Sequence, residues 1–158
     1  MKRPENEKKR YQTFEDLEVY QVAREFRRAM YRVAKQLPGE EKFGLCSQIR
    51  RAAVSLTNNI AEGHGRFHFL EQIKFTLHSR GSLEELIDDL NVCDDERYLS
   101  VEEIASLKQC GWRLRQLIDG YIRYLRQQKN SGPSSSVRET ALTYDDAEEL
   151  DDDSRISM

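Results

Sequence analysis

The sequence lacks the features that build membrane spans, disulfide frameworks and metal clusters. No apolar run approaches the roughly 20 residues needed to cross a bilayer, and the charged start, MKRPENEKKR, has no apolar stretch after it. The three cysteines, Cys46, Cys93 and Cys110, are an odd number at wide spacing, which argues against disulfide bonds and against a zinc site. We therefore expect a cytoplasmic protein, with no membrane association, whose cysteines are reduced and serve as small fillers on helices.

Proline and glycine are scarce, and they fall between stretches of helical apolar spacing. That spacing predicts helices at about 14–37, 41–62, 69–94 and 101–129. Their ends are marked by the capping pair Thr13 and Asp16, by Pro38-Gly39, by a turn at Gly63-His64-Gly65, and by the capping box of Ser100 with Glu103. Four amphipathic helices on short connections predict an all-α fold, an up-down-up-down antiparallel four-helix bundle.

The two ends of the chain differ from its body. We expect a flexible charged arm at 1–12, the bundle at 13–129 and a disordered acidic tail at 130–158. Residues 1–130 carry a net charge of +3, and residues 131–158 carry −6. Such a split can accompany nucleic-acid contact or autoinhibition.

The second predicted helix contains a seam that does not stay apolar. Its apolar positions are spaced four, three and four apart: Leu45, Ile49, Ala52 and Leu56. The next two seam positions hold Asn59 and Gly63. Because a buried amide needs hydrogen-bond partners, either Asn59 is a satisfied core residue that fixes the register of the bundle, or a polar pocket lies beneath Asn58, Asn59 and Glu62.

Glu62 lies in the last turn of this helix, where a negative charge opposes the helix dipole. A cation nearby would offset that cost. We therefore expect Glu62 to be shielded from water and paired with Arg51, Arg66 or Arg80. In the third helix, Gly81 interrupts the apolar face formed by Leu70, Leu77 and their neighbours, which we explain by another backbone packing close to it.

Several strings of this region stand in a characteristic order. They are Arg50-Arg51-Ala52-Ala53-Val54-Ser55, Asn59-Ile60-Ala61-Glu62-Gly63 and Gly65-Arg66, preceded by Phe14-x-x-Leu17-x-x-Tyr20 and Phe43-x-Leu45, and followed by Arg80-Gly81-Ser82-Leu83-x-Glu85-Leu86. The order resembles that of a bacterial four-helix-bundle family over about residues 13–128. The family includes proteins encoded in intervening sequences of 23S ribosomal RNA genes and the accessory variability protein of diversity-generating retroelements.

The resemblance implies a homo-oligomer, because known members form five-fold rings. It also implies RNA or a reverse transcriptase as partner, because the retroelement relatives are basic proteins that accompany that enzyme. This chain departs from them in its near-neutral body and acidic tail, which moves it toward the intervening-sequence branch. The sequence leaves room for assembly, since apolar or aromatic residues lie beside the predicted seams: Val22, Tyr31, Leu117 and Tyr124.

An enzymatic alternative rests on the carboxylates of the third helix. Acidic side chains at helical spacing share a face and could hold magnesium in a helical nucleotide phosphohydrolase: Glu84, Glu85, Asp88 and Asp89. A solvated acidic face that pairs with arginines is the simpler explanation. No nucleophile elbow, phosphate loop or Cys–His pair is present, and His64 and His68 flank a predicted turn without further ligands. We therefore expect no catalytic residue, metal, cofactor or small-molecule substrate.

Basic residues offer the other functional surface. They follow the outer sides of the first and last predicted helices: Arg24, Arg27, Arg28, Arg32 and Lys35, and then Arg113, Arg115, Arg123, Arg126 and Lys129. Two basic faces could track a phosphate backbone, or they could be ordinary solvated surface. The acidic tail could compete with RNA for Arg123, Arg126 and Lys129, or it could only aid solubility. We therefore predict a non-enzymatic, oligomeric scaffold or binding module.

Overall fold

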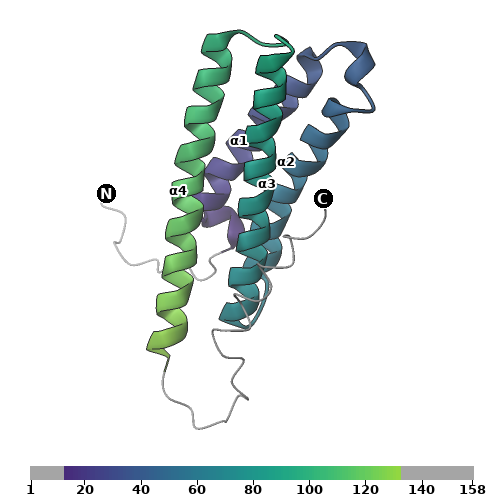
Figure 1. The fold of residues 1–158 in the computed structure, drawn as a ribbon. Helices are drawn as coiled ribbons and strands as arrows, with labels where there is room; N and C mark the ends of the chain where they lie inside the picture. Colours follow the sequence, from purple (N-terminus) through teal and green to yellow (C-terminus); the bar gives the residue numbers. More distant parts are fainter. Residues whose placement is uncertain (1–12, 133–158) are drawn as a thin grey trace, which may run out of the picture.

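The computed structural model describes residues 13–132, and these fold into a bundle of four antiparallel α-helices (Figure 1). The helices are α1 (Glu18–Gln36), α2 (Leu45–His64), α3 (Phe69–Asp95) and α4 (Val101–Ser131), with 3-10 turns η1 (Phe14–Asp16) and η2 (Gly39–Glu41) before the first two. Each helix packs against the next, and α1 also contacts α4. The predicted four-helix bundle is confirmed, while the predictions for residues 1–12 and for most of the tail fall outside the described residues.

The first helix begins later than predicted. Leu17 has an extended backbone (φ −71°, ψ 128°), so α1 starts at Glu18. Thr13 and Asp16 belong to the separate turn η1, in which the backbone N–H of Thr13 donates to Asp16 Oδ2 at 3.0 Å. The capping pair was therefore recognised correctly, but it closes a short turn rather than opening the long helix.

The second helix also begins later, at Leu45 rather than Glu41. The carboxylate of Glu41 accepts the backbone N–H of Leu45 at 3.0 Å and the hydroxyl of Tyr98 at 2.9 Å. Both hydrogen bonds favour the charged carboxylate and hold the pKa of Glu41 below its usual value. Glu41 thus satisfies a free N–H at the start of α2 from a position outside that helix.

The core follows the predicted seam on α1 and departs from it on α3. The α1 seam is buried throughout: Val19, Ala23, Phe26, Met30, Val33 and Leu37. On the first half of α3, however, Leu70 and Leu77 are 47% and 43% exposed, so their predicted place on the apolar face is wrong. Thr76, Ser79 and Ser82 are buried there instead. The Ser79 hydroxyl donates to the Leu56 carbonyl of α2 at 2.5 Å, which satisfies it inside the core.

Two glycines have roles other than those predicted. Gly63 does not form a turn: it is buried in the last turn of α2, and no glycine within 13–132 has a positive φ. A Cβ at Gly63 would lie 3.0 Å from Phe75 Cβ and 3.1 Å from the Gln72 carbonyl oxygen. Gly81 is exposed, and a Cβ there would meet nothing within 4 Å. The close helix approach that we predicted at Gly81 is therefore found at Gly63.

Of the three cysteines, Cys46 and Cys93 are buried as predicted, whereas Cys110 is exposed on α4. The Cys46 thiol donates to the Ala34 carbonyl at 3.2 Å and thereby joins α2 to α1. A search of the described helices finds none that is both long enough and apolar enough to span a membrane.

Candidate functional site

The outer surface of α1 carries a dense group of cations. We call it the basic α1 face, and its members are Arg24, Arg27, Arg28, Arg32 and Lys35. Spacings of three, four and one residues keep these side chains away from the buried seam of the helix. Four of the five, all but Arg24, line an open depression of about 310 Å³ together with Tyr31.

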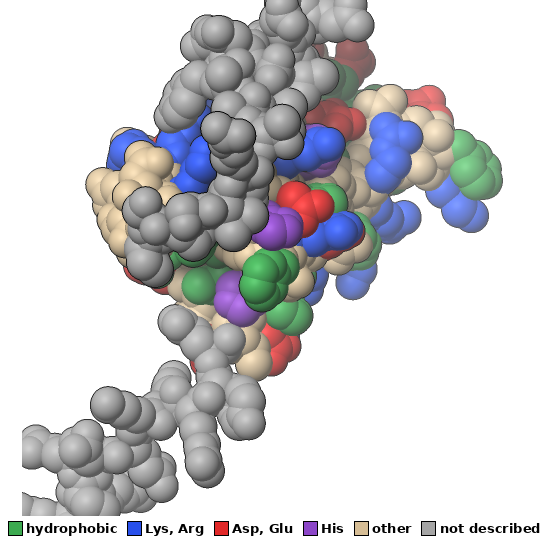
Figure 2. All heavy atoms as spheres, turned by 90° about the horizontal axis from the view of Figure 1, so that it is seen from below, with side chains coloured by type: hydrophobic (Ala, Val, Ile, Leu, Met, Phe, Trp, Pro, Cys, Tyr) green, Lys and Arg blue, Asp and Glu red, His purple; other side chains and the backbone are tan. Residues whose placement is uncertain are grey.

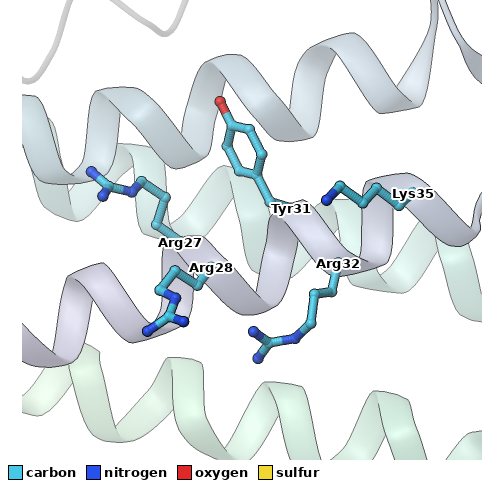
Figure 3. A pocket seen from close by; sticks show the side chains of 5 residues that line it. All are labelled: Arg27, Arg28, Tyr31, Arg32 and Lys35. Carbon is cyan, nitrogen blue, oxygen red and sulfur yellow. The ribbon is translucent and has the colours of Figure 1, made fainter.

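The cations of the depression point to two sides of the helix (Figure 3). Arg27, Tyr31 and Lys35 follow one another at one-turn intervals, and Arg27 Nη1 donates to the hydroxyl of Thr57 on α2 at 2.8 Å. Arg28 and Arg32 point to the other side, toward α4. Arg50 lies two turns before Thr57 on α2, so it also belongs to the side of α2 that faces α1.

Few acidic groups neutralise this face. Within residues 13–132, Arg28 is its only member in an ion pair, with Glu25 at 3.1 Å. That pair is exposed on both sides, and exposed pairs are weak because water screens them. Arg24, Arg32 and Lys35 are exposed and free of carboxylate partners in the same range. Among residues 13–132, this face therefore carries a net positive charge.

The basic residues of α4 do not form one face. Arg115 donates to Glu84 of α3 and lies 3.5 Å from Asp119, so its charge is offset inside the bundle. Arg126 follows it by three turns on that side of α4, but it is exposed and has no ion pair within residues 13–132. The other three cations are exposed, but their spacings of ten and six residues place them at different angles around the helix: Arg113, Arg123 and Lys129.

The residues around the motif of α2 are distributed along the α2–α3 contact rather than gathered in a pocket. Asn59 donates to the carbonyl and the hydroxyl oxygen of Ser55 at 2.9 and 3.0 Å, so it is satisfied within its own helix. Ser55 also accepts from Ser82 of α3 at 2.8 Å. Asn58 and Glu62 are exposed. The prediction that Asn59 is satisfied is confirmed, but its hydrogen bonds stay within α2, so they do not fix the register between helices. The exposure of Asn58 and Glu62 does not fit an enclosed pocket beneath them.

The predicted partner of Glu62 is present, but the predicted shielding is not. Arg66 donates to Glu62 at 2.5 Å, while half of the Glu62 side chain remains exposed. An exposed pair of this kind contributes only about 0.3–0.5 kcal/mol, so the expectation of a buried, strongly stabilising pair is wrong. The other two candidate arginines pair elsewhere: Arg51 with Glu85 at 3.7 Å and Arg80 with Asp119 at 2.8 Å.

The acidic residues of α3 do not converge on one point. Glu84 and Glu85 point to arginines of α4 and α2 respectively, and Asp88 accepts the Asn91 amide at 3.1 Å. Asp89 is buried against the core. Within residues 13–132, no group of three or more His, Cys, Asp or Glu side chains is arranged to hold a metal ion.

The end of the bundle where α2 joins α3 exposes apolar and histidine side chains rather than a group of cations. Figure 2 looks onto this end and shows histidine and hydrophobic side chains lying beside one another. Phe67 is 92% exposed there, and Phe69, Leu70 and Leu77 are exposed on the adjoining part of α3. His64 ends α2, and His68 directly precedes α3. This exposed apolar group was not foreseen, because the spacing of Leu70 and Leu77 suggested burial.

Comparison with known proteins identifies the family. Residues 15–120, about two thirds of the chain, match the family described as 23S rRNA-intervening sequence protein. No curated protein matches the sequence. The matched range runs from η1 into α4 and includes the α2–α3 contact with its glycine and serine residues. The chain therefore belongs to the family of 23S rRNA-intervening sequence proteins.

Proposed function

We propose that this chain is a non-enzymatic, cytoplasmic helical module that assembles with copies of itself and associates with RNA through the basic α1 face. The observation that carries the RNA proposal is the set of cations on that face, of which Arg28 alone is in an ion pair within residues 13–132. Cations that follow a helix at one-turn intervals can each neutralise a phosphate and release its counterion. The face also belongs to one rigid element, which keeps the charges in register.

RNA suits this face better than a protein such as a reverse transcriptase. Protein interfaces depend on apolar and aromatic residues that are buried at their centre. The basic α1 face offers four arginines and a lysine around a single, partly buried tyrosine, Tyr31. Its chemistry is that of phosphate contacts, which carry most non-specific affinity for nucleic acids.

Removing three charges from this face should weaken RNA binding. We expect the variant Arg24→Ala/Arg32→Ala/Lys35→Ala to bind a labelled RNA hairpin with a single-stranded arm at least tenfold more weakly than the parent at low salt. The slope of log affinity against log salt should fall by about 2, since each lost phosphate contact removes roughly 0.7–0.9 from it. Fluorescence anisotropy at several salt concentrations measures both quantities.

The matched control removes the same charge from α4. Arg113→Ala/Arg123→Ala/Lys129→Ala replaces three exposed cations that have no ion pair in the described range. We expect it to lower the affinity less than the α1 variant does. Equal losses would show general electrostatic attraction rather than an interface centred on α1, and absence of RNA binding by the parent would refute the proposal.

Assembly is supported by the exposed apolar residues at the α2–α3 end: Phe67, Phe69, Leu70 and Leu77. Of the residues that we first assigned to an assembly surface, three also pack partly against the monomer core: Val22, Tyr31 and Leu117. We expect light scattering to give a mass greater than two copies of the 18.6 kDa chain. Leu70→Gln/Leu77→Gln, which changes two residues on one side of α3, should lower that mass.

Val101→Gln is the control for this experiment, because Val101 is exposed at the start of α4, away from the α2–α3 end. Its mass should equal that of the parent. A parent mass near 18.6 kDa at micromolar concentration would refute assembly. Assembly that persists in the double glutamine variant would show that the copies meet at another surface.

A further inference from the structure

Tyr31 lies at the centre of the basic α1 face. It follows Arg27 by one turn and precedes Lys35 by one turn, while Arg28 and Arg32 lie on its other side (Figure 3). Its ring stands between Arg27 and Lys35, with the hydroxyl pointing away from α1. The ring is partly buried against the core, which limits its freedom to move. A partly buried aromatic side chain thus lies among four cationic side chains.

Tyr31 differs from the other tyrosines between residues 13 and 132. Each of those has an aromatic or hydrogen-bonding partner within the bundle: Phe14 for Tyr20, Glu41 for Tyr98, and Tyr121 and Tyr124 for each other. In the same part of the chain, the Tyr31 hydroxyl has no hydrogen-bond partner and its ring has no stacked or edge-on aromatic neighbour. Within the described bundle, the Tyr31 hydroxyl and the Tyr31 ring are therefore both available to contact a ligand.

A ring among cations suits one form of RNA in particular. In a duplex the base faces are stacked on one another, and the deep, narrow major groove keeps side chains away from the base edges. In a single strand the base faces are free, and proteins bind such strands by combining basic grooves with aromatic stacking. We propose that the basic α1 face binds single-stranded RNA, with one base stacked on Tyr31 and its neighbouring phosphates on the flanking cations; this inference rests on the proposed function.

The test compares one sequence in two forms. A labelled, unstructured 12-nucleotide RNA and the blunt duplex of the same sequence are titrated with the full chain. The parent should bind the single strand more tightly than the duplex. Tyr31→Leu, which keeps an apolar side chain against the core, should bind the single strand about tenfold more weakly and the duplex as before. Its salt dependence should equal that of the parent, because no phosphate contact is lost.

Two further variants make the result specific. Tyr31→Phe keeps the ring and should bind the single strand within about twofold of the parent. Tyr124→Leu removes an exposed tyrosine from α4 and should leave binding of the single strand unchanged. A thermal melt of each variant checks the fold, and the ratio of single-strand to duplex affinity is a readout that general loosening of α1 would not selectively change.

The outcomes separate this inference from the proposed function. If single strand and duplex bind equally well and Tyr31→Leu changes neither, the inference is wrong while RNA binding stands. Equal losses of both forms in Tyr31→Leu would also overturn it, because they indicate a structural effect on the whole face. If the parent binds neither RNA, the inference and the proposed function fail together.

Discussion

Replacing Asp89 by asparagine should raise the free energy of unfolding by about 1–3 kcal/mol at pH 7.5 and should change it little at pH 4. Asp89 is 5% exposed, and its Oδ2 atom has no hydrogen-bond partner within the described residues. Burial, together with the nearby carboxylates of Glu85 and Asp88, raises the pKa of Asp89 from 3.8 to about 6. At neutral pH the buried, charged carboxylate of Asp89 therefore lowers the free energy of unfolding.

The direction of the pH dependence follows from that shift. Because the pKa of Asp89 is higher in the folded state than in the unfolded chain, the folded protein binds the proton more tightly. The contribution of Asp89 to the free energy of unfolding is greatest below about pH 4 and is lost as the pH rises to about 6. Above that pH the contribution no longer changes. A shift of this size corresponds to about 3 kcal/mol. Asparagine removes the charge but keeps a buried amide, so the expected gain is somewhat smaller.

Denaturant melts at pH 4, 6 and 7.5 and at one protein concentration measure this effect. Asp94→Asn is the matched control: its side chain is exposed on the same helix and is not among the groups that shift the pKa of Asp89, so it should change stability by less than about 0.5 kcal/mol at each pH. The interpretation fails if Asp89→Asn is no more stable than the parent at pH 7.5. It also fails if the gain is the same at pH 4, because the charge would then not be its cause.

The position of Asp89 illustrates what the sequence could not show. Periodicity places Asp89 with Glu84, Glu85 and Asp88 on a solvated acidic face, since all four fall within two turns. In the bundle, α3 contacts both α2 and α4, so the buried arc of this helix is wider than one seam and reaches Asp89. The single apolar stripe of α1 was predicted correctly, because α1 packs mainly against α2 and only lightly against α4. The buried arc of α3 is wider, because this helix packs closely against both of its neighbours.

The sequence likewise predicted one part of the candidate site, the cations of α1, but not the arrangement of the cations of α4. The cations of α1 recur at one-turn intervals, and that spacing is sufficient to place them on one face. Tyr31 fits the same spacing, but its apolar ring led us to assign it to an assembly surface instead. The cations of α4 could not be judged in this way, because the ion pair of Arg115 with Glu84 joins two helices and depends on their relative rotation. Contacts between helices are not visible in the spacing along one of them.

Gly63→Ala and Gly81→Ala should change stability in opposite directions. Both glycines lie inside helices, so alanine gains up to about 1 kcal/mol at each through helix propensity alone. At Gly81 nothing opposes that gain, because a Cβ would meet no atom within 4 Å. At Gly63 the same Cβ would lie 3.0 Å from Phe75 Cβ and 3.1 Å from the Gln72 carbonyl oxygen, both of which are fixed to the backbone of α3.

Relief of the contact at Gly63 requires α3 to move away from α2, and overpacking of this kind costs about 1–3 kcal/mol. We therefore expect Gly63→Ala to unfold about 1–2 kcal/mol more easily than the parent and Gly81→Ala to be up to about 1 kcal/mol more stable. Thermal and denaturant melts at equal protein concentration measure the stability of each variant. Because both variants gain helix propensity from alanine, the difference between their stabilities reports mainly the contact at Gly63. Equal changes in stability for the two variants would contradict this prediction. They would show that α3 can move away from α2 at little cost in free energy, so that packing would not require glycine at position 63.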